Sequence, residues 1–302
     1  MVPFCIQPYT KKVIGLRHLK SILLIPFAAL AIYLIYYYTA EKEYNMQVVN
    51  IENRYLHFSL DDVNSCMQKL RNTDCKTIFE DSTLRVLKEW HKKYGIVASL
   101  YVMGDFTINS HYAKELIENS QWLKWGYHGT TASSRKEDMN IFYKQVMDSV
   151  GNDIIIDKCP RIHYFHANHS SCMRLKELGC IGFLTCDDWS FNAEKRGSNY
   201  YLTKEQSTTL EAHDRMLDTE NNIYFIKTDF RLEHIKERFG NVANLIKYYN
   251  SKRENELIVF SHEWSFRNHL QECDSIFSWI HAGGGALTSL CTISYGAQSY
   301  PS

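Results

Sequence analysis

The chain lacks an excess of charge of either sign. Its 302 residues include 34 Lys and Arg and 34 Asp and Glu, so the formal net charge at pH 7 is zero. A protein that binds nucleic acid through the phosphate backbone needs a basic surface to do so. The composition gives no support to such a partner, and we expect no nucleic-acid binding.

The chain also lacks cysteines at metal-binding spacing. None of its nine cysteines forms a CxxC pair with another, which argues against a zinc site built from thiolates. Eight of the nine follow residue 40, and an even number in an exported domain permits disulfides, whose pairing the sequence does not reveal. Buried free cysteines with one or two bridges are the alternative. No internal repeat or low-complexity tract stands out.

One long uncharged segment stands apart from the rest. Residues 21–38 read SILLIPFAALAIYLIYYY, close to the roughly 20 residues that cross a bilayer. Four basic residues precede this segment and two glutamates follow it: Lys11, Lys12, Arg17, Lys20, Glu41 and Glu43. The positive-inside rule then predicts a cytosolic segment 1–20, a single-pass anchor and an extracytoplasmic domain. A cleaved signal peptide is the alternative.

A short polar stalk, residues 39–53, is expected to connect the anchor to a folded domain at residues 54–302. Strand-like and helix-like segments alternate in this domain, which indicates an α/β fold. The expected strands are Tyr55–Leu60, Val97–Val102, Leu123–Tyr127, Arg161–Phe165, Ile181–Thr185, Ile223–Lys227 and Leu257–Ser261. About seven parallel strands of this kind predict a distorted (β/α) barrel. The expected helices are Ser82–Tyr94, Ala113–Ser120, Asp138–Val150, Ser170–Leu178, Asn241–Lys252 and Arg267–His281.

Polar side chains recur where these strands end. The ends carry Asp61-Asp62, His128, Arg161 with His163 and His166, Asp187-Asp188-Trp189 and His262-Glu263-Trp264. In a parallel barrel the C-terminal ends of the strands share one rim. Two adjacent carboxylates repel each other unless a cation offsets their charge. The coincidence at five strand ends predicts a metal-assisted hydrolytic site.

These motifs resemble, in order, those of the polysaccharide deacetylases with a NodB homology domain, carbohydrate esterase family 4. The family's Thr-Phe-Asp-Asp-Gly corresponds to Ser-Leu-Asp-Asp-Val at residues 59–63, and its Ala-Thr-Phe-Phe strand to residues 98–101. Its histidine turn, its Arg-x-Pro-aromatic motif and its final strand ending in His correspond to residues 126–128, 161–164 and 258–262. The resemblance covers most of residues 54–265. It is nearest to deacetylase-like proteins associated with bacterial surface polysaccharide, which share the Arg-x-His-Tyr variant.

The resemblance implies a role for each matching residue. Asp62 and His128 would be metal ligands, and Asp61 would be the general base that takes a proton from the attacking water. His262 would be the general acid that protonates the departing amine. Arg161 would orient Asp61 through a charge-assisted hydrogen bond. This division of labour would explain why two carboxylates are adjacent.

The sequence departs from the family pattern at one ligand. The second histidine of the family's His-Ser/Thr-x-x-His motif falls on Ala132, so a third ligand must come from elsewhere. His163, two residues from Arg161, would share a strand face with it, whereas His166 would lie on the opposite face. We favour His163 and keep His166 open. Val63 replaces the glycine that follows the Asp pair, which affects the backbone shape rather than the ligands.

The function implied by the resemblance is the hydrolysis of N-acetyl groups on sugars of a cell-surface glycan or its precursor. The metal would be a divalent ion, with zinc favoured by an Asp-His-His set. Trp189, Trp264 and Tyr164 would bind the sugar. The alternatives are a membrane-anchored glycan-binding protein without activity, an O-acetyl esterase and a scaffold of a polysaccharide export complex.

Overall fold

The computed structural model describes most of the predicted domain and two isolated positions before it. The described residues are 44–49, 55–72, 75–130, 135–189, 199–252, 256–283 and 286–287, with Leu30 and Ile32. The chain divides into two units, Met1–Glu43 and Tyr44–Ser302. The predicted segments 1–20 and 21–38 lie outside the described residues apart from Leu30 and Ile32. Within the described part, no helix has the length and apolar character needed to cross a bilayer.

The larger sheet is wholly parallel and contains the centre of the domain. It has six strands, ordered β4-β3-β2-β9-β8, with β10 paired to β2. Its strands are β2 (Tyr55–Val63), β3 (Ala98–Val102), β4 (Leu123–Tyr127), β8 (Phe230–Arg231), β9 (Glu256–His262) and β10 (Ala286–Leu287). Strands β3 and β9 are buried along almost their whole length, as expected for parallel strands covered by helices.

A second sheet has four strands in the order β1-β6-β7-β5. They are β1 (Met46–Val49), β5 (Gly182–Asp187), β6 (Arg215–Asp218) and β7 (Ile223–Thr228). Only β5 and β7 are parallel, because β6 runs antiparallel to both β1 and β7. The prediction of seven parallel strands in one barrel is therefore wrong in detail, although the α/β class and the mainly parallel pairing are confirmed. Residues 46–49 form a strand, so the predicted stalk 39–53 is wrong over that stretch.

An irregular segment, residues 155–160, connects the two sheets. On one side, its backbone both donates to and accepts from the backbone of Trp125 in β4. On the other side, its carbonyl groups accept hydrogen bonds from the amides of Ile181, just before β5, and Leu184, within β5. On the other side of the second sheet, Asp229 connects β7 to β8. Its backbone amide donates a hydrogen bond to the carbonyl of Ile258 in β9. The strands thus form a distorted barrel in which the irregular segment 155–160 takes the place of one strand.

The predicted strand Arg161–Phe165 is wrong for a local reason. Residues His163–Phe165 form a 3-10 turn, η3, and Tyr164 and Phe165 both have φ near 55°. Two successive left-handed residues reverse the chain, so an extended strand cannot continue through them. The turn begins at His163, three residues after the end of the irregular segment at Pro160.

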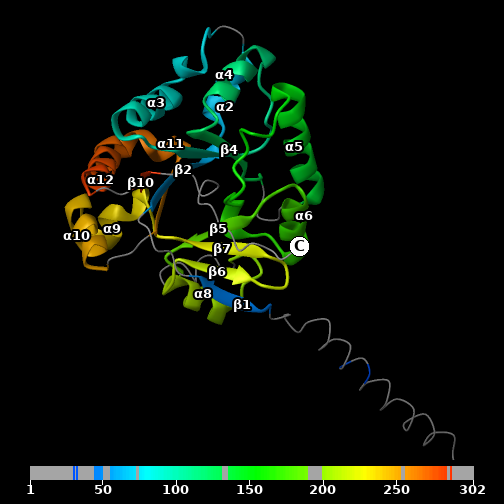
Figure 1. Ribbon diagram of the computed structural model, residues 1–302, viewed down its shortest axis with the longest axis vertical. Coiled ribbons are helices and arrows are strands. Elements are labelled where there is room, and N and C mark those ends of the chain that lie inside the picture. The colour runs from blue at the N-terminus through cyan, green and yellow to red at the C-terminus, as the bar shows by residue number, and fades with distance from the viewer. Residues whose placement is uncertain are drawn as a thin grey trace, which may run out of the picture. The chain divides into compact units, whose positions relative to one another are not determined.

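Helices surround the strands (Figure 1), most of them within a few residues of the predicted bounds. They are α2 (Ser65–Arg71), α3 (Ser82–Tyr94), α4 (Ala113–Glu118), α5 (Lys136–Val150), α6 (His169–Glu177), α8 (Lys204–Glu211), α9 (Ile235–Phe239), α10 (Val242–Lys252), α11 (Glu263–Phe266) and α12 (Leu270–Ala282). Short 3-10 turns are η1 (Ile78–Glu80), η2 (Ser110–Tyr112), η4 (Leu232–His234) and η5 (Arg267–His269).

Helix α3 shows how local sequence sets these bounds. The Asp81 carboxylate accepts hydrogen bonds from the amides of Thr83 and Leu84 at 2.8 and 3.0 Å, which satisfies the first turn. Gly95 ends the helix with φ of 71°, a conformation that costs glycine little. The buried ring of Trp90 meets Phe277 of α12 edge-on with centroids 5.1 Å apart, which packs the two helices over the sheet.

Candidate active site

A bulge in β2 directs its two adjacent carboxylates in different directions. Leu60 pairs with Leu100 of β3 and Val63 pairs with Val102. Between these two pairs β2 therefore contains one residue more than β3. Asp62 takes φ of 55° at this bulge. In a regular strand, neighbouring side chains point to opposite faces of the sheet. Asp61 keeps the orientation toward the barrel interior, and the bulge turns the side chain of Asp62 toward the rim and not to the outer face of the sheet.

Asp61 lies against a buried arginine inside the barrel. It is 2% exposed, Arg161 is fully buried, and Arg161 Nη1 donates to Asp61 Oδ1 at 2.9 Å. The same guanidinium donates to Ser59 Oγ at 2.8 Å and to Thr228 Oγ1 at 3.3 Å. Its Cζ lies 4.1 Å from the ring centroid of Phe260. This charge-assisted bond fixes the Asp61 carboxylate and compensates its negative charge.

Asp62, His128 and His163 form a compact group at the rim. One potential ligand atom of each lies within 4.8 Å of the other two. Asp62 Oδ1 is 3.2 Å from His128 Nε2 and 3.9 Å from His163 Nε2, and this buried oxygen accepts no hydrogen bond. His128 Nδ1 lies 2.6 Å from the carbonyl oxygen of Arg161, to which it would donate. That bond leaves Nε2 with its lone pair toward Asp62, as in a metal-binding imidazole. The three residues therefore fit a divalent cation.

The ionisation of this group also suits a cation. Burial raises the pKa of Asp62, but the neighbouring His128, together with His262 and Trp264, lowers it by more, so the net pKa is well below the ordinary range. Burial, reinforced by His128, lowers the pKa of His163. A carboxylate and a neutral imidazole are the forms that coordinate metals.

His163 reaches this group by way of the η3 turn, not along a strand face. Its amide donates to the carbonyl of His128 at 2.8 Å, which joins the turn to the end of β4. His166 is exposed and does not belong to the group of potential ligands. Ala132, where the family's second histidine would fall, lies outside the described residues.

His262 ends β9 beside Asp61, with which it is in register on β2. Its backbone amide and its Nδ1 lie 2.9 and 3.3 Å from Glu233 Oε1. Burial lowers the pKa of His262. The bond to Glu233 and the charge of Asp61 raise it by more, so the net pKa is above the ordinary value. Burial raises the pKa of Glu233, and the bond to His262 more than reverses this, to about 2. Glu233 therefore favours the protonated form of His262.

The three aromatic residues expected to contact a sugar lie in different surroundings. Trp264 is 69% exposed, stacks on the His262 ring with centroids 5.2 Å apart, and donates from Nε1 to Asp62 Oδ2 at 3.2 Å. Tyr164 is 55% exposed, and its ring centroid is 4.1 Å from that of His163. Trp189 is 8% exposed and lines a separate cavity on the outer wall. The structure brings Trp264 and Tyr164 to the site and leaves Trp189 outside it.

Other acidic residues at the strand ends have structural partners. The fully buried Asp187 binds Arg231 of β8 through both carboxylate oxygens, with Arg231 Nε 2.8 Å from Oδ2. Glu263 accepts the amides of Asn64, Ser65 and Cys66 at 2.7–2.8 Å and so secures the turn that follows the Asp pair. These two acidic residues stabilise the structure of the rim and do not belong to the group of potential metal ligands.

Glu233 is the residue of this site that sequence reasoning missed. It belongs to the turn η4, in the stretch Arg-Leu-Glu-His-Ile-Lys-Glu-Arg, where neither periodicity nor a motif distinguishes it from the neighbouring charges. Ser261 Oγ also donates to its Oε1, at 2.8 Å. A search for a carboxylate partner of His262 could have singled it out, but only with knowledge of which loop meets β9.

The chain matches no protein-family model, and no curated protein matches it. Among solved structures it is similar to the Xyl-CE4 domain of a multidomain xylanase from the hindgut metagenome of Trinervitermes trinervoides. The TM-score is 0.43 and the identity 11%, over 78% of this chain and 88% of that one. It is also similar to the catalytic domain of a peptidoglycan N-acetylglucosamine deacetylase from Eubacterium rectale, with a TM-score of 0.37 and 14% identity over 80% and 91% of the two chains.

A third similar structure is a CE4 family pseudoenzyme from Bacillus anthracis, with a TM-score of 0.38 and 8% identity over 80% of this chain and 65% of that one. At these identities and TM-scores the likenesses decide nothing about activity, which has to be argued from the residues of the site. Carbohydrate esterase family 4, which the sequence motifs of this chain resemble, is the family of two of these three similar structures.

Proposed function

We propose that the protein is a metal-dependent hydrolase that removes N-acetyl groups from sugars of a cell-surface polysaccharide or its precursor. The observation that carries this proposal is the arrangement around Asp62, His128 and His163. A carboxylate held by Arg161 and a histidine held by Glu233 come from paired positions of β2 and β9, next to the three potential ligands. Hydrolysis of an amide needs these parts together: a base, an acid and an electrophile.

Each residue of the chain then has a defined task. Asp61 takes a proton from the attacking water, and Arg161 holds its carboxylate in place. His262, protonated on both nitrogens, keeps Nδ1–H on Glu233 and gives its other proton to the amine that leaves. The raised pKa of His262 favours the form that carries this proton. Trp264 and Tyr164 offer exposed rings on which a sugar can stack.

Asp62, His128 and His163 would hold a divalent ion, and one oxygen with two nitrogen ligands favours zinc. Such an ion would act as a Lewis acid and lower the pKa of water. The proposal needs Asp62 to be available to the ion. Its Oδ1 has no hydrogen-bond donor, while Trp264 donates to Oδ2, so one oxygen is held and the other faces the imidazoles.

The test measures bound metal and released acetate on the full-length chain. Zinc content would be determined by elemental analysis, and acetate release from tetra-N-acetylchitotetraose would be followed enzymatically. We expect about one ion per chain, lost in His128→Ala and His163→Ala but kept in His166→Ala. Acetate release should follow the metal. A protein that stays metal-free after incubation with zinc would contradict the proposal.

A glycan-binding protein without activity is the second candidate, because the second histidine of the family motif is Ala132 in this chain. It predicts sugar binding without acetate release, even in protein loaded with zinc. An O-acetyl esterase would use the same groups, and acetate release from an O-acetylated but not an N-acetylated sugar would identify it.

We also propose that residues 21–38 anchor the protein and leave the domain outside the cytoplasm. This rests on the uncharged segment and the basic residues before it. Protease added to intact cells should remove the domain, whereas a cytosolic control protein survives. Protection of the domain in intact cells would contradict this topology.

A further inference from the structure

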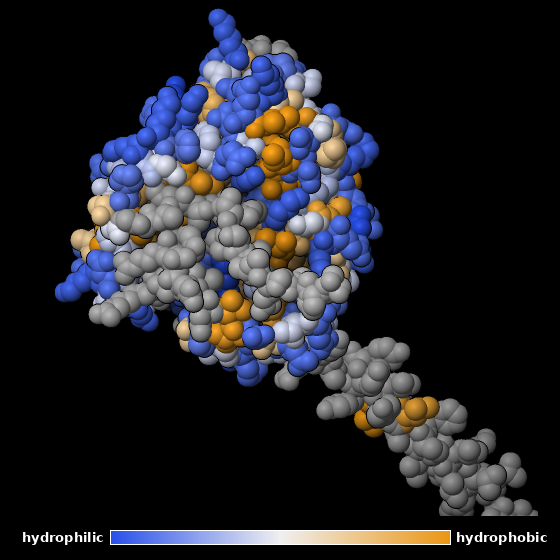
Figure 2. Space-filling model, viewed as in Figure 1, coloured by the Kyte–Doolittle hydropathy of each residue, from blue (hydrophilic) through white to orange (hydrophobic). Residues whose placement is uncertain are grey.

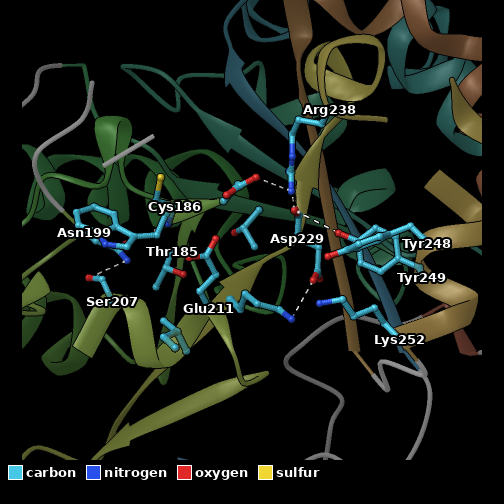
Figure 3. A pocket seen from close by; sticks show the side chains of 15 residues that line it. Thr185, Cys186, Asn199, Ser207, Glu211, Asp229, Arg238, Tyr248, Tyr249 and Lys252 are labelled. Carbon is cyan, nitrogen blue, oxygen red and sulfur yellow. Dashed lines mark hydrogen bonds and ion pairs between the residues drawn. The ribbon is translucent and has the colours of Figure 1, made fainter. Parts of the chain in front are cut away.

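A cavity lies on the outer wall of the strands, beside β5 and β7 and next to helices α8, α9 and α10. Its volume is about 310 Å³, within the lower range of small-molecule sites, roughly 300–1,000 Å³. We call it the outer-wall cavity; it is lined by Thr185, Cys186, Asp188, Trp189, Asn199, Ser207, Leu210, Glu211, Lys227, Thr228, Asp229, Arg238, Tyr248, Tyr249 and Lys252. These residues come from β5, β7, α8, α9, α10 and adjoining loops (Figure 3).

Strand β7 lies between this cavity and the candidate active site, and Thr228 borders both. Thr228 at its end accepts a hydrogen bond from Arg161, which in turn holds Asp61 inside the barrel. Lys227, the preceding residue, lines the outer-wall cavity, and none of Asp62, His128 and His163 does so. A ligand in the cavity would therefore contact none of the three potential metal ligands.

The charges of the outer-wall cavity balance. Arg238 Nη2 lies 2.7 Å from Asp188 Oδ2, and Lys227 Nζ lies 3.2 Å from Asp229 Oδ1. Figure 3 shows Arg238, Asp229, Glu211 and Lys252 among the residues that line the cavity. With three basic and three acidic side chains in the lining, an ion of either sign meets repulsion as well as attraction.

A ligand with many hydroxyl groups suits this lining better than an ion or an apolar compound. A carboxylate such as that of Glu211 can accept a hydrogen bond from a hydroxyl, and Arg238, which also contacts Asp188 and the carbonyl of Asp229, has further N–H groups that can donate to one. Tyr248 is 40% exposed and adds an aromatic surface for the apolar face of a sugar ring. Among the described residues on the face shown in Figure 2, hydrophilic surface predominates and the apolar areas are separate.

We propose that the outer-wall cavity binds a sugar unit of a neutral glycan, independently of the metal site. The choice of a glycan rests on the proposed function, since an enzyme on a polymer gains from a second hold on the same chain. The cavity's balanced charge and hydroxyl-binding groups do not depend on that function.

The experiment measures sugar binding by isothermal titration calorimetry on the full-length chain. The probes are tetra-N-acetylchitotetraose, cellotetraose and maltotetraose, with tetragalacturonate as a charged comparison. All variants carry His128→Ala and Trp264→Ala, which disable the candidate active site. We expect at least one neutral probe to bind, and Tyr248→Ala and Glu211→Gln each to weaken it about tenfold, the size of one good polar or stacking contact.

Lys247→Ala is the matched control, because Lys247 is exposed on the same helix α10 and does not line the cavity. Its affinity should equal that of the parent. The proposal is overturned if no neutral probe binds, if tetragalacturonate binds more tightly, or if Tyr248→Ala and Glu211→Gln leave the affinity unchanged. Acetate release by the otherwise unaltered protein tests the proposed function separately, so either idea can fail alone.

Discussion

Two parts of the same rim carry similar residues and differ in what surrounds them. On the β2–β4 side, a buried oxygen of Asp62 faces two imidazole nitrogens and accepts no hydrogen bond. On the β5–β8 side, Asp187 is fully buried and both of its oxygens are held by Arg231. Both are aspartates at the end of a parallel strand. Only the first is arranged to receive a cation.

The comparison teaches that a strand-end carboxylate is informative only together with its partner. A guanidinium that binds both oxygens neutralises the charge of the carboxylate and satisfies its hydrogen bonds, so the pair has a structural role. Imidazoles that present lone pairs leave the charge incomplete, and a divalent ion would complete it. Asp61 lies between these cases, since Arg161 binds one of its oxygens.

The largest expected effect separates the two adjacent carboxylates. Asp62→Ala should abolish metal binding and reduce kcat/KM by at least about 10³-fold, because it removes a ligand of the electrophile. Asp61→Asn should keep the metal and lose turnover to a similar extent, since it removes only the base. Metal analysis and acetate release on both proteins make the test. Equal metal content in the two variants would refute this division of labour.

Removal of the acid should have the next largest effect. His262→Ala should lower kcat by about 10²–10⁴-fold, the usual contribution of a general acid, with metal content unchanged. His269→Ala is the matched control, because His269 lies a few residues further along the chain in η5 and outside the candidate site. Loss of bound metal in His262→Ala would mean that the histidine is a ligand instead.

Much of the fold and the chemical character of the site could be predicted from the sequence. Apolar runs ending in acidic or basic residues identified β2, β4 and β9, because burial of parallel strands leaves a direct pattern. The antiparallel strands β1 and β6 are short and were not predicted, since pairing with distant segments decides them.

The position of His163 shows what local patterns cannot determine. The sequence favoured it through alternation on a strand, yet it lies near Asp62 through the turn at Tyr164, whose φ is 55°. Glu233 escaped prediction for a related reason, because its partner His262 is 29 residues further along the chain. Contacts between loops depend on the assembled barrel and have no periodic signature.

The other side of the comparison predicts loss of stability rather than of chemistry. Asp187→Asn leaves the Arg231 guanidinium buried beside a neutral amide, and we expect about 3–5 kcal/mol less free energy of unfolding, as for a broken buried pair. Metal content of the folded protein should not change. Urea denaturation of this variant and of Asp148→Asn, whose pair with Lys144 is exposed, gives the contrast. A metal-free but equally stable Asp187→Asn would reverse the roles assigned to the two sides.

The smallest effect concerns the pH dependence of the acid. Glu233 raises the pKa of His262, so the protonated acid persists to a higher pH than an ordinary histidine would allow. In Glu233→Gln the attraction disappears, and the basic limb of the kcat profile should move toward lower pH while metal content stays the same. Stability follows the same sign: the raised pKa of His262 contributes stability that is complete below its unfolded pKa and is lost as pH rises through the folded value. Acetate release measured across pH on zinc-loaded wild type and Glu233→Gln would show the shift, and coincident basic limbs would mean that Glu233 only shapes the loop. Because Glu233 itself titrates near pH 2, its own protonation cannot produce a limb in the neutral range.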